Sequence, residues 1–360
     1  MRPLKHHGWF ALLPVALLTA CGGEPPGSGE TLSAVDVPWP VTAFPANPEI
    51  MNDVPAARIE LGRLLFYETL LSGDGETACA TCHSEIWGMG DSLERSVGLG
   101  AGLLAGPGRH GPNVVRRNAP ALYNMAFRES FFLDGRTATL EEQALLPPRT
   151  PDEMDRAPED SVAEMATIPE YVDRFAEAFP EDPRVTVENV ASALAAFQRT
   201  IVSKRSLYDA YLEGDLGALT DDVIEGMFRF AEMGCDDCHR PPLFDSERFE
   251  NRKVPGIDGI VDDGRMEVTG LAQDRGKFRV PSLRNVAFTS PYFHNGSMRN
   301  LDDAVQHELE QSGMPYTEED ARLIRLFIDK ALRDKSREPA RPRSLPSGLP
   351  VPLDGTNISR

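Results

Sequence analysis

The sequence predicts a mainly α-helical protein of two domains with long irregular loops. Apolar residues recur at helical spacing in five segments, whereas the alternation typical of strands is scarce. The five segments are 56–69, 187–202, 219–233, 301–309 and 318–332. A length of 360 residues allows one or two domains, and one cysteine motif occurs once in each half of the chain.

The helical segments carry further sequence signals. In the first, the apolar residues that share one helical face are Ile59, Leu61, Leu64, Leu65 and Phe66. In the third, Thr220 is placed to cap the helix, and Asp221 and Asp222 lie in its first turn, where negative charge is favourable. Residues 98–113 and 254–273 are rich in Gly, Pro and Asp, and both segments are too long for ordinary connections. We therefore expect them to fold around bound groups.

The motif C-x-x-C-H occurs as Cys79-Ala80-Thr81-Cys82-His83 and as Cys235-Asp236-Asp237-Cys238-His239. It is the attachment signature of a c-type haem, with the cysteines bound to the porphyrin and the histidine bound to iron. A zinc site or a redox dithiol is the alternative for a single C-x-x-C. Both copies carry the trailing histidine, however, and they lie too far apart for a zinc ribbon. The sequence thus predicts two c-type cytochrome-like domains holding two covalently bound haem c groups.

The N-terminus has the pattern of an export signal. A basic start is followed by an apolar run over 9–18 and by Leu18-Thr19-Ala20-Cys21, which matches a lipoprotein cleavage site. The run is too short to span a membrane. We expect residues 1–20 to be a lipoprotein signal peptide and Cys21 to carry a lipid anchor on the periplasmic side of a bacterial membrane. An ordinary cleaved signal peptide of a soluble periplasmic protein is the alternative.

The remaining chain divides around the motifs. We expect a flexible linker over 21–45, a first haem domain over 46–202, a second over 203–335 and a Pro-rich tail over 336–360. The two halves share, apart from the motif, the pair Arg117-Asn118 and Arg284-Asn285. Loss of Arg2 and Lys5 with the signal would take the net charge from −19 to −21. Such acidity disfavours nucleic acid and suits a basic electron carrier, although solubility alone would also explain it.

The segments that follow the motifs resemble the bacterial dihaem cytochrome c peroxidase and MauG family. The resemblance spans roughly 61–332 and rests on both haem motifs, Asn118-Ala119-Pro120-Ala121-Leu122, Asp134-Gly135-Arg136 and Pro291-Tyr292-Phe293-His294-Asn295-Gly296. It implies that the first haem, with His83 proximal, is the peroxidatic one and that the second transfers electrons.

The resemblance also implies roles for single residues. Glu153 matches the catalytic glutamate and Gln143 the active-site glutamine, and such residues could move a proton and hold peroxide. His110 matches a distal histidine that blocks the iron until the other haem is reduced, and Pro147 matches a pocket proline. A calcium site is implied at Asn118 with the backbone carbonyls of Thr289 and Pro291, since oxygen ligands suit this hard cation.

Two positions depart from the family pattern. Leu133 stands where an interhaem tryptophan is usual, and Glu308 stands where the second haem has an axial Met or Tyr. Glu308 is a poor haem ligand, so we expect the neighbouring His307 to be the sixth ligand, with Met298 as the alternative and Met314 more remote. A surface position for His307 is the opposing interpretation. His294 is expected to contact a haem propionate.

Three functions remain open from the sequence. The first is a peroxidase that reduces hydrogen peroxide to water with electrons from a small c-type cytochrome or cupredoxin. The second is a MauG-like oxidase that modifies a side chain of a partner protein, against which Leu133 and Glu308 both argue. The third is a dihaem electron-transfer protein without a substrate, which would leave Gln143 and Glu153 without a purpose. A homodimer is possible in this family.

Overall fold

The computed structural model describes residues 35–46, 54–334 and 339–354. The expected signal peptide and Cys21 lie outside the described residues. In the described ranges, no helix combines the length and the apolar character that crossing a membrane requires. Residues 35–360 form one unit that contains two hydrophobic cores.

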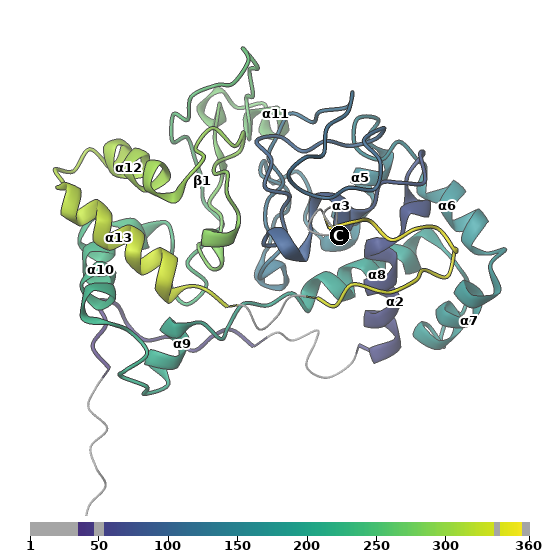
Figure 1. Cartoon of the computed structure of the whole chain (residues 1–360), viewed down its shortest axis with the longest axis horizontal. Coiled ribbons are helices and arrows are strands. Elements are labelled where there is room, and N and C mark those ends of the chain that lie inside the picture. The colour runs from purple at the N-terminus through teal and green to yellow at the C-terminus, as the bar shows by residue number, and fades with distance from the viewer. Residues whose placement is uncertain (1–34, 47–53, 335–338, 355–360) are drawn as a thin grey trace, which may run out of the picture. The chain divides into compact units, whose positions relative to one another are not determined.

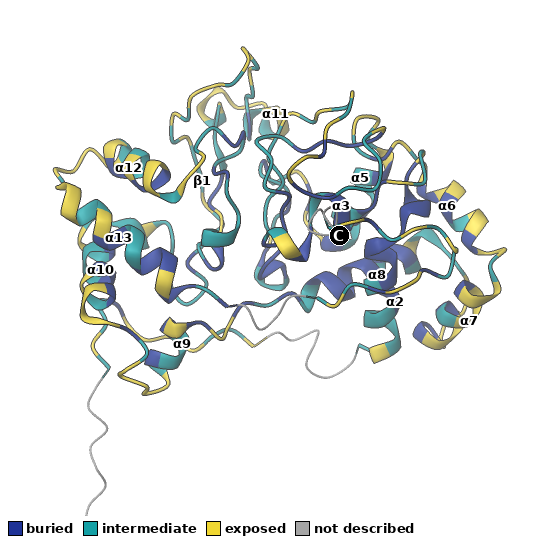
Figure 2. Cartoon of the chain, in the orientation of Figure 1, coloured by how far each residue is buried: buried dark blue, intermediate teal, exposed yellow. Residues whose placement is uncertain are grey.

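The first core is built on the packing of α2 (Ala56–Tyr67) against α8 (Val187–Arg199) (Figure 1). The two helices approach so closely at Gly62 that a Cβ there would lie 1.9 Å from the carbonyl oxygen of Ala193. Around them lie α3 (Cys79–Cys82), α4 (Leu140–Ala144), α5 (Leu146–Arg149), α6 (Pro158–Met165) and α7 (Pro169–Ala178). Figure 2 shows α8 largely buried and the outer faces of α6 and α7 exposed.

The second core repeats this arrangement with α10 (Asp221–Glu232) against α13 (Glu318–Ala331). Gly226 permits the close approach, because a Cβ there would lie 2.1 Å from the carbonyl oxygen of Leu323. The helices α9 (Leu207–Leu212), α11 (Met266–Thr269) and α12 (Leu301–Ser312) complete this half. Thr220 precedes α10 as expected, but its side chain makes no capping hydrogen bond.

An aromatic cluster fills the second core. Its rings pack mostly edge to face and belong to Trp39, Tyr208, Phe230, Phe244 and Phe327. Trp39 is buried there and donates a hydrogen bond from Nε1 to the Tyr208 hydroxyl at 2.9 Å. Part of the segment expected to be a flexible linker therefore packs into the second core.

Strand structure is sparse, as expected. The described residues contain one sheet, in which β1 (Phe249–Glu250) pairs antiparallel with β2 (Phe278–Arg279). Short 3-10 turns join the remaining segments: Thr69–Leu71, Glu85–Trp87, Met125–Phe127, Cys235–Asp237, Ala272–Asp274 and Val286–Phe288. Most of the chain around the haem motifs is thus irregular and depends on side-chain contacts.

The two halves contain an internal repeat that extends beyond the haem motif and the shared Arg-Asn pair. Asn124 and Asn285, 161 positions apart, both have positive φ, of 63° and 62°, and each precedes a 3-10 turn. Phe132 and Phe293 follow at the same offset with φ of 63° and 68°. The repeat therefore pairs Asn124, not Asn118, with Asn285, and it aligns the start of α4 with the start of α12.

Candidate functional site: two haem-binding motifs

Both C-x-x-C-H motifs adopt the same helical turn. The His83 N–H donates to the Cys79 carbonyl and the His239 N–H donates to the Cys235 carbonyl, each at 2.9 Å. A single turn brings two cysteines and the following histidine onto one short stretch of backbone. The turn is α3 in the first half and the 3-10 turn Cys235–Asp237 in the second.

The two motif histidines are oriented alike by main-chain carbonyls. His83 Nδ1 lies 3.1 Å from the Met89 oxygen, and His239 Nδ1 lies 3.2 Å and 3.1 Å from the oxygens of Phe244 and Pro281. These oxygens accept from a protonated Nδ1, which leaves the lone pair on Nε2 for iron. Burial lowers the pKa of both rings, that of His239 to about 4, so both are neutral ligands at physiological pH.

A cavity of about 820 Å³ surrounds the second motif. Cys235, Cys238 and His239 line it, together with mainly apolar side chains of α10, α12 and α13. Its volume lies in the range of cofactor cavities, about 300–1,000 Å³. Two thiols and a neutral imidazole converging on such a cavity are the donor set of a covalently attached haem. The residues present therefore fit the group that the motif implies.

The first motif lies beside the predicted catalytic glutamate. Burial, and to a smaller extent the negative charge of Glu153, raises the pKa of the Cys79 thiol to about 12. Burial, and then other charges including Glu153, also raise the pKa of Cys82. The structure thus places Glu153 within electrostatic range of both cysteines, and its catalytic role stays a prediction.

Glu153 is held in a tight turn. Its N–H donates to the Thr150 carbonyl at 3.0 Å, and the next residue is fixed by a 2.7 Å hydrogen bond from Gly73 N–H to the Met154 carbonyl. Burial raises the pKa of the Glu153 carboxyl, and the positive charge of Arg136 opposes this shift. No hydrogen bond to the carboxylate is present in the part of the chain that the structure describes, so it remains free for a bound molecule.

Gln143 lies half-buried on α4, which Thr139 caps by accepting from the Glu142 N–H at 3.1 Å. Among the described residues its amide has no hydrogen-bond partner. Pro147 is half-buried on the adjoining α5. The structure thus supplies an unpaired amide and an unpaired carboxylate in the first half of the chain.

His110 is exposed in its loop, whereas Glu153 is half-buried. Its Nδ1 lies 2.6 Å from the Gly108 carbonyl oxygen. The neighbouring Arg109, which the sequence interpretation passed over, is buried and ties the loop together by donating to main-chain oxygens, including Val97 and Gly98 at 2.7 Å. The position of Arg109 directly beside His110 was the sequence signal that could have identified it.

The junction between the halves contains Leu133 and the predicted calcium residues. The cavity around the second haem motif is lined by all four of these residues: Leu133, Asn118, Thr289 and Pro291. The Asn118 side-chain amide donates to the Leu93 carbonyl at 2.6 Å. No group of three or more His, Cys, Asp or Glu side chains with metal-binding geometry occurs among the residues described. A calcium site made of amide and carbonyl oxygens remains a prediction.

The structure does not bring His307 or Met298 into the cavity around the second haem motif. The lining includes Glu308 and Met314 instead. His307 Nε2 lies 2.8 Å from the Arg252 carbonyl oxygen, so this nitrogen is occupied by a backbone contact. His294 does line the cavity, stacked on Phe278 at 3.8 Å between ring centroids. Burial lowers its pKa to about 4.

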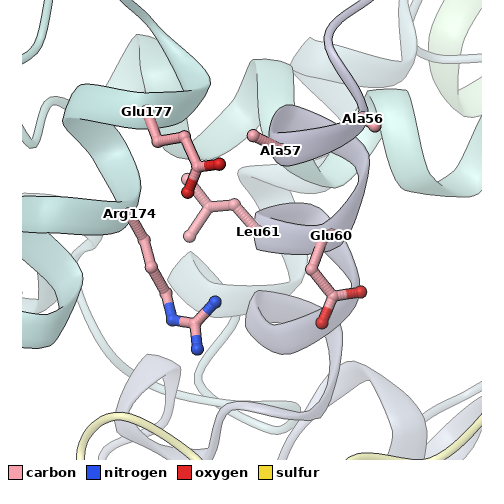
Figure 3. A pocket seen from close by; sticks show the side chains of 6 residues that line it. All are labelled: Ala56, Ala57, Glu60, Leu61, Arg174 and Glu177. Carbon is pink, nitrogen blue, oxygen red and sulfur yellow. The ribbon is translucent and has the colours of Figure 1, made fainter.

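A second, smaller hollow of about 270 Å³ lies between α2 and α7. Its lining is Ala56, Ala57, Glu60, Leu61, Arg174 and Glu177, seen in Figure 3. It contains no motif residue, and its charged side chains come from exposed helix faces. The residues able to bind a cofactor therefore lie at the two haem motifs and not in this hollow.

Comparisons with known proteins agree with this geometry. The family model described as di-haem cytochrome c peroxidase matches residues 56–217. The chain is 34% identical to cytochrome c551 peroxidase of Nitrosomonas europaea over 82% of this chain and 83% of that protein. It is 31% identical to methylamine utilization protein MauG of Methylorubrum extorquens, over 72% of this chain and 70% of that one.

A solved structure of a MauG-like protein associated with microbial copper homeostasis superposes with a TM-score of 0.70 at 27% identity. The match covers 85% of this chain and 98% of that one. The fold, the two haem motifs and relatives above 30% identity over most of the chain lead to one assignment: the chain belongs to the di-haem cytochrome c peroxidase family, a family of oxidoreductases that act on peroxide.

Proposed function

We propose that the protein reduces hydrogen peroxide to water at the first haem, with electrons that a small c-type cytochrome or cupredoxin delivers to the second. Each peroxide takes up two electrons and two protons and yields two waters. When bound, the two haems supply the iron that binds peroxide and the storage of electrons. The observation that carries the proposal is the half-buried Glu153 carboxylate, which has no hydrogen-bond partner among the described residues and lies near Cys79 and Cys82.

Glu153 is the proton-transfer group in this proposal. Peroxide cleavage needs a base that takes a proton from one oxygen and returns it to the other, leaving oxygen. Burial raises the pKa of Glu153 towards the working pH, which makes its protonated form accessible. Asp152 adds to that rise and Arg136 limits it, so the carboxyl can both accept and donate.

Gln143 is the orienting group. Its unpaired amide can donate to a peroxide oxygen and accept from a peroxide O–H. An amide cannot move a proton itself, which separates its role from that of Glu153. The capped start of α4 fixes the position of the amide, because Thr139 holds the Glu142 N–H at 3.1 Å.

His110 is the gating residue in this proposal. Peroxide needs a vacant position on the iron, so a histidine that binds there must leave first. His110 is exposed in its loop, and the Arg109 hydrogen bonds would keep its neighbours in place while the ring moves. We accordingly expect His110→Gly to be active without pre-reduction.

The partners and the location are proposed on the basis of the sequence. A net charge of −19 favours a basic donor through long-range attraction. We propose attachment through Cys21 to the periplasmic side of a bacterial membrane and calcium bound by Asn118, Thr289 and Pro291. The calcium proposal is supported by the fact that all three residues line the cavity around the second haem motif.

The test is peroxide-dependent oxidation of a reduced small cytochrome by the dihaem protein, with and without pre-reduction. We expect turnover only after pre-reduction, and its loss in Glu153→Gln with both haems still reducible. Turnover that survives Glu153→Gln would overturn the assigned role. Peroxide consumption without cytochrome oxidation would favour the MauG-like alternative, for which the relative at 31% identity is the supporting observation.

A further inference from the structure

We propose that the Glu308 carboxylate is the sixth ligand of the second haem iron and that Arg252 positions it. The inference goes beyond the proposed function, because it concerns iron coordination and holds whether or not the protein turns over peroxide. It replaces the expectation that His307 or Met298 fills this position. Three features of the second half of the chain support it.

The first feature is the face that α12 presents to the cavity. The lining residues of this helix are Leu301, Ala304, Val305, Glu308, Leu309 and Ser312. They recur at three- and four-residue spacing and therefore share one face. Glu308 is the one charged residue of that set and the one that offers an anionic oxygen donor. His307 precedes Glu308 by one residue on the helix and therefore lies off this face.

The second feature is Arg252, which fixes both neighbouring side chains. Its Nε donates to Glu308 Oε2 at 2.7 Å, and its Nη2 donates to the Glu308 carbonyl at 3.0 Å. Its own carbonyl oxygen lies 2.8 Å from His307 Nε2. One residue thus holds the carboxylate at the cavity wall and occupies the nitrogen of the imidazole that would compete. Within the described ranges, Glu308 Oε1 has no hydrogen-bond partner and remains available as a donor.

The third feature is the internal repeat. At the offset of 161 that aligns Asn124 with Asn285, Glu308 corresponds to Pro147 of the first half. A proline side chain has no donor atom, whereas a carboxylate has two. The two halves thus differ at this matched position. Proline leaves the sixth coordination position of the first iron without a ligand, whereas glutamate can fill that of the second.

An anionic oxygen ligand has a defined consequence. Carboxylate is a hard donor that favours ferric over ferrous iron, whereas a thioether raises the potential. Its ligand field is also weaker than that of imidazole. We therefore expect the second haem to be high-spin in the ferric state and to have a lower midpoint potential than a His/Met haem.

The experiment compares Glu308→Gln, Glu308→Met and two control variants of the full dihaem protein. Haem content is determined first, and then electron paramagnetic resonance and redox titration are recorded for each haem. We expect Glu308→Gln to raise the midpoint potential of one haem and leave the other unchanged. Glu308→Met should convert the same haem from high spin to low spin. His307→Gln and Met314→Leu should change neither haem.

Two outcomes would overturn the proposal. One is a change of spin state or potential in His307→Gln or Met314→Leu. The other is a second haem that is unaffected by both substitutions at Glu308. Should Glu308→Gln lose haem, Glu308→Met supplies the same readout from a side chain of similar length. Peroxide turnover is measured separately, so a failure of the proposed function leaves this result interpretable.

Discussion

Gly98 lies directly against the backbone of Glu153: a Cβ built on Gly98 would be 2.6 Å from the Glu153 carbonyl oxygen and 2.0 Å from that of Asp152. Real Cβ atoms do not approach backbone oxygens so closely, so any side chain at this position displaces the turn. The predicted catalytic carboxylate is therefore positioned by a residue that has no chemistry of its own.

The close contact predicts the effect of Gly98→Ala. The added methyl group should shift the turn at Glu153 and cost about 1–3 kcal/mol of unfolding free energy, as overpacking does. Peroxide turnover should fall at least tenfold while both haems stay attached. Gly217→Ala is the control, because its nearest neighbouring atom would be 3.5 Å away. Equal turnover in both variants would contradict the positioning role of Gly98.

A second prediction concerns Arg136, whose positive charge lowers the pKa of Glu153 against the effect of burial. Arg136→Gln removes that charge, so the pKa of the carboxyl should rise. The acidic limb of the pH profile of kcat/KM should then move to higher pH. Arg149→Gln, which breaks an exposed pair with Glu159, should leave the limb in place. A limb that does not move in Arg136→Gln would exclude Glu153 as its source.

The raised pKa of Glu153 also has a stability consequence. The folded protein binds this proton more tightly than the unfolded chain, so the carboxyl destabilises the fold progressively as pH rises from the ordinary glutamate range through the folded-state pKa. Glu153→Gln removes the ionisation. Its unfolding free energy, relative to the wild type, should therefore increase between pH 4 and pH 8 in denaturant titrations. A difference that is constant over that range would contradict the shift.

The sequence predicted the main helices better than it predicted the contacts of the candidate site. The starts of the helices at residues 56, 187, 301 and 318 agree with the structure, because periodic apolar residues and N-caps are local signals. Helices α6 and α7 were missed, although each begins at a proline, which is a helix-start signal, and α7 buries Tyr171 and Phe175 on one face. The motifs identified the haem-binding residues, because covalent attachment depends on spacing alone.

Other parts of the site depend on contacts between distant residues. Arg252 and Glu308 are 56 positions apart, and no local pattern indicates that one holds the other. The repeat, by contrast, could have been found in the sequence. The pattern Pro-x-Leu-x-Asn-x-Ala-Phe occurs at both 120–127 and 281–288, and Asn124 and Asn285 share a positive φ. The Arg-Asn pair drew attention away from this longer match.

A fourth prediction concerns Arg117, which joins the two halves. Its guanidinium lies 2.6 Å from Asp134 and 2.7 Å from Asp262, and the three side chains are 12%, 5% and 5% exposed. Arg117→Ala leaves two buried carboxylates without this partner and should cost about 3–5 kcal/mol of unfolding free energy. Arg322→Ala, at an exposed pair with Glu319, should leave the unfolding free energy nearly unchanged, because water screens such a pair. Similar losses in denaturant titrations would contradict this assignment.

The last prediction concerns the C-terminal segment, which pairs with the loop that carries His110. The Ala105 N–H donates to the Leu353 carbonyl at 2.7 Å, and the Leu353 N–H donates to the Leu103 carbonyl at 2.8 Å. Leu345 is buried in the first core, and Arg341 pairs with the buried Glu85 at 2.8 Å. The segment therefore ties the His110 loop to the body of the first domain.

A chain that ends at residue 338 loses all four contacts. Amide hydrogens of residues 99–111 should then exchange faster, because two main-chain hydrogen bonds and the adjoining buried contact are gone. A chain that ends at residue 354 keeps every one of these contacts and is the matched control. Hydrogen exchange of both dihaem proteins measures the difference directly. Unchanged protection after truncation at 338 would show that the hydrogen bonds of Arg109 to Val97 and Gly98 are sufficient to hold the loop, because they do not involve the tail.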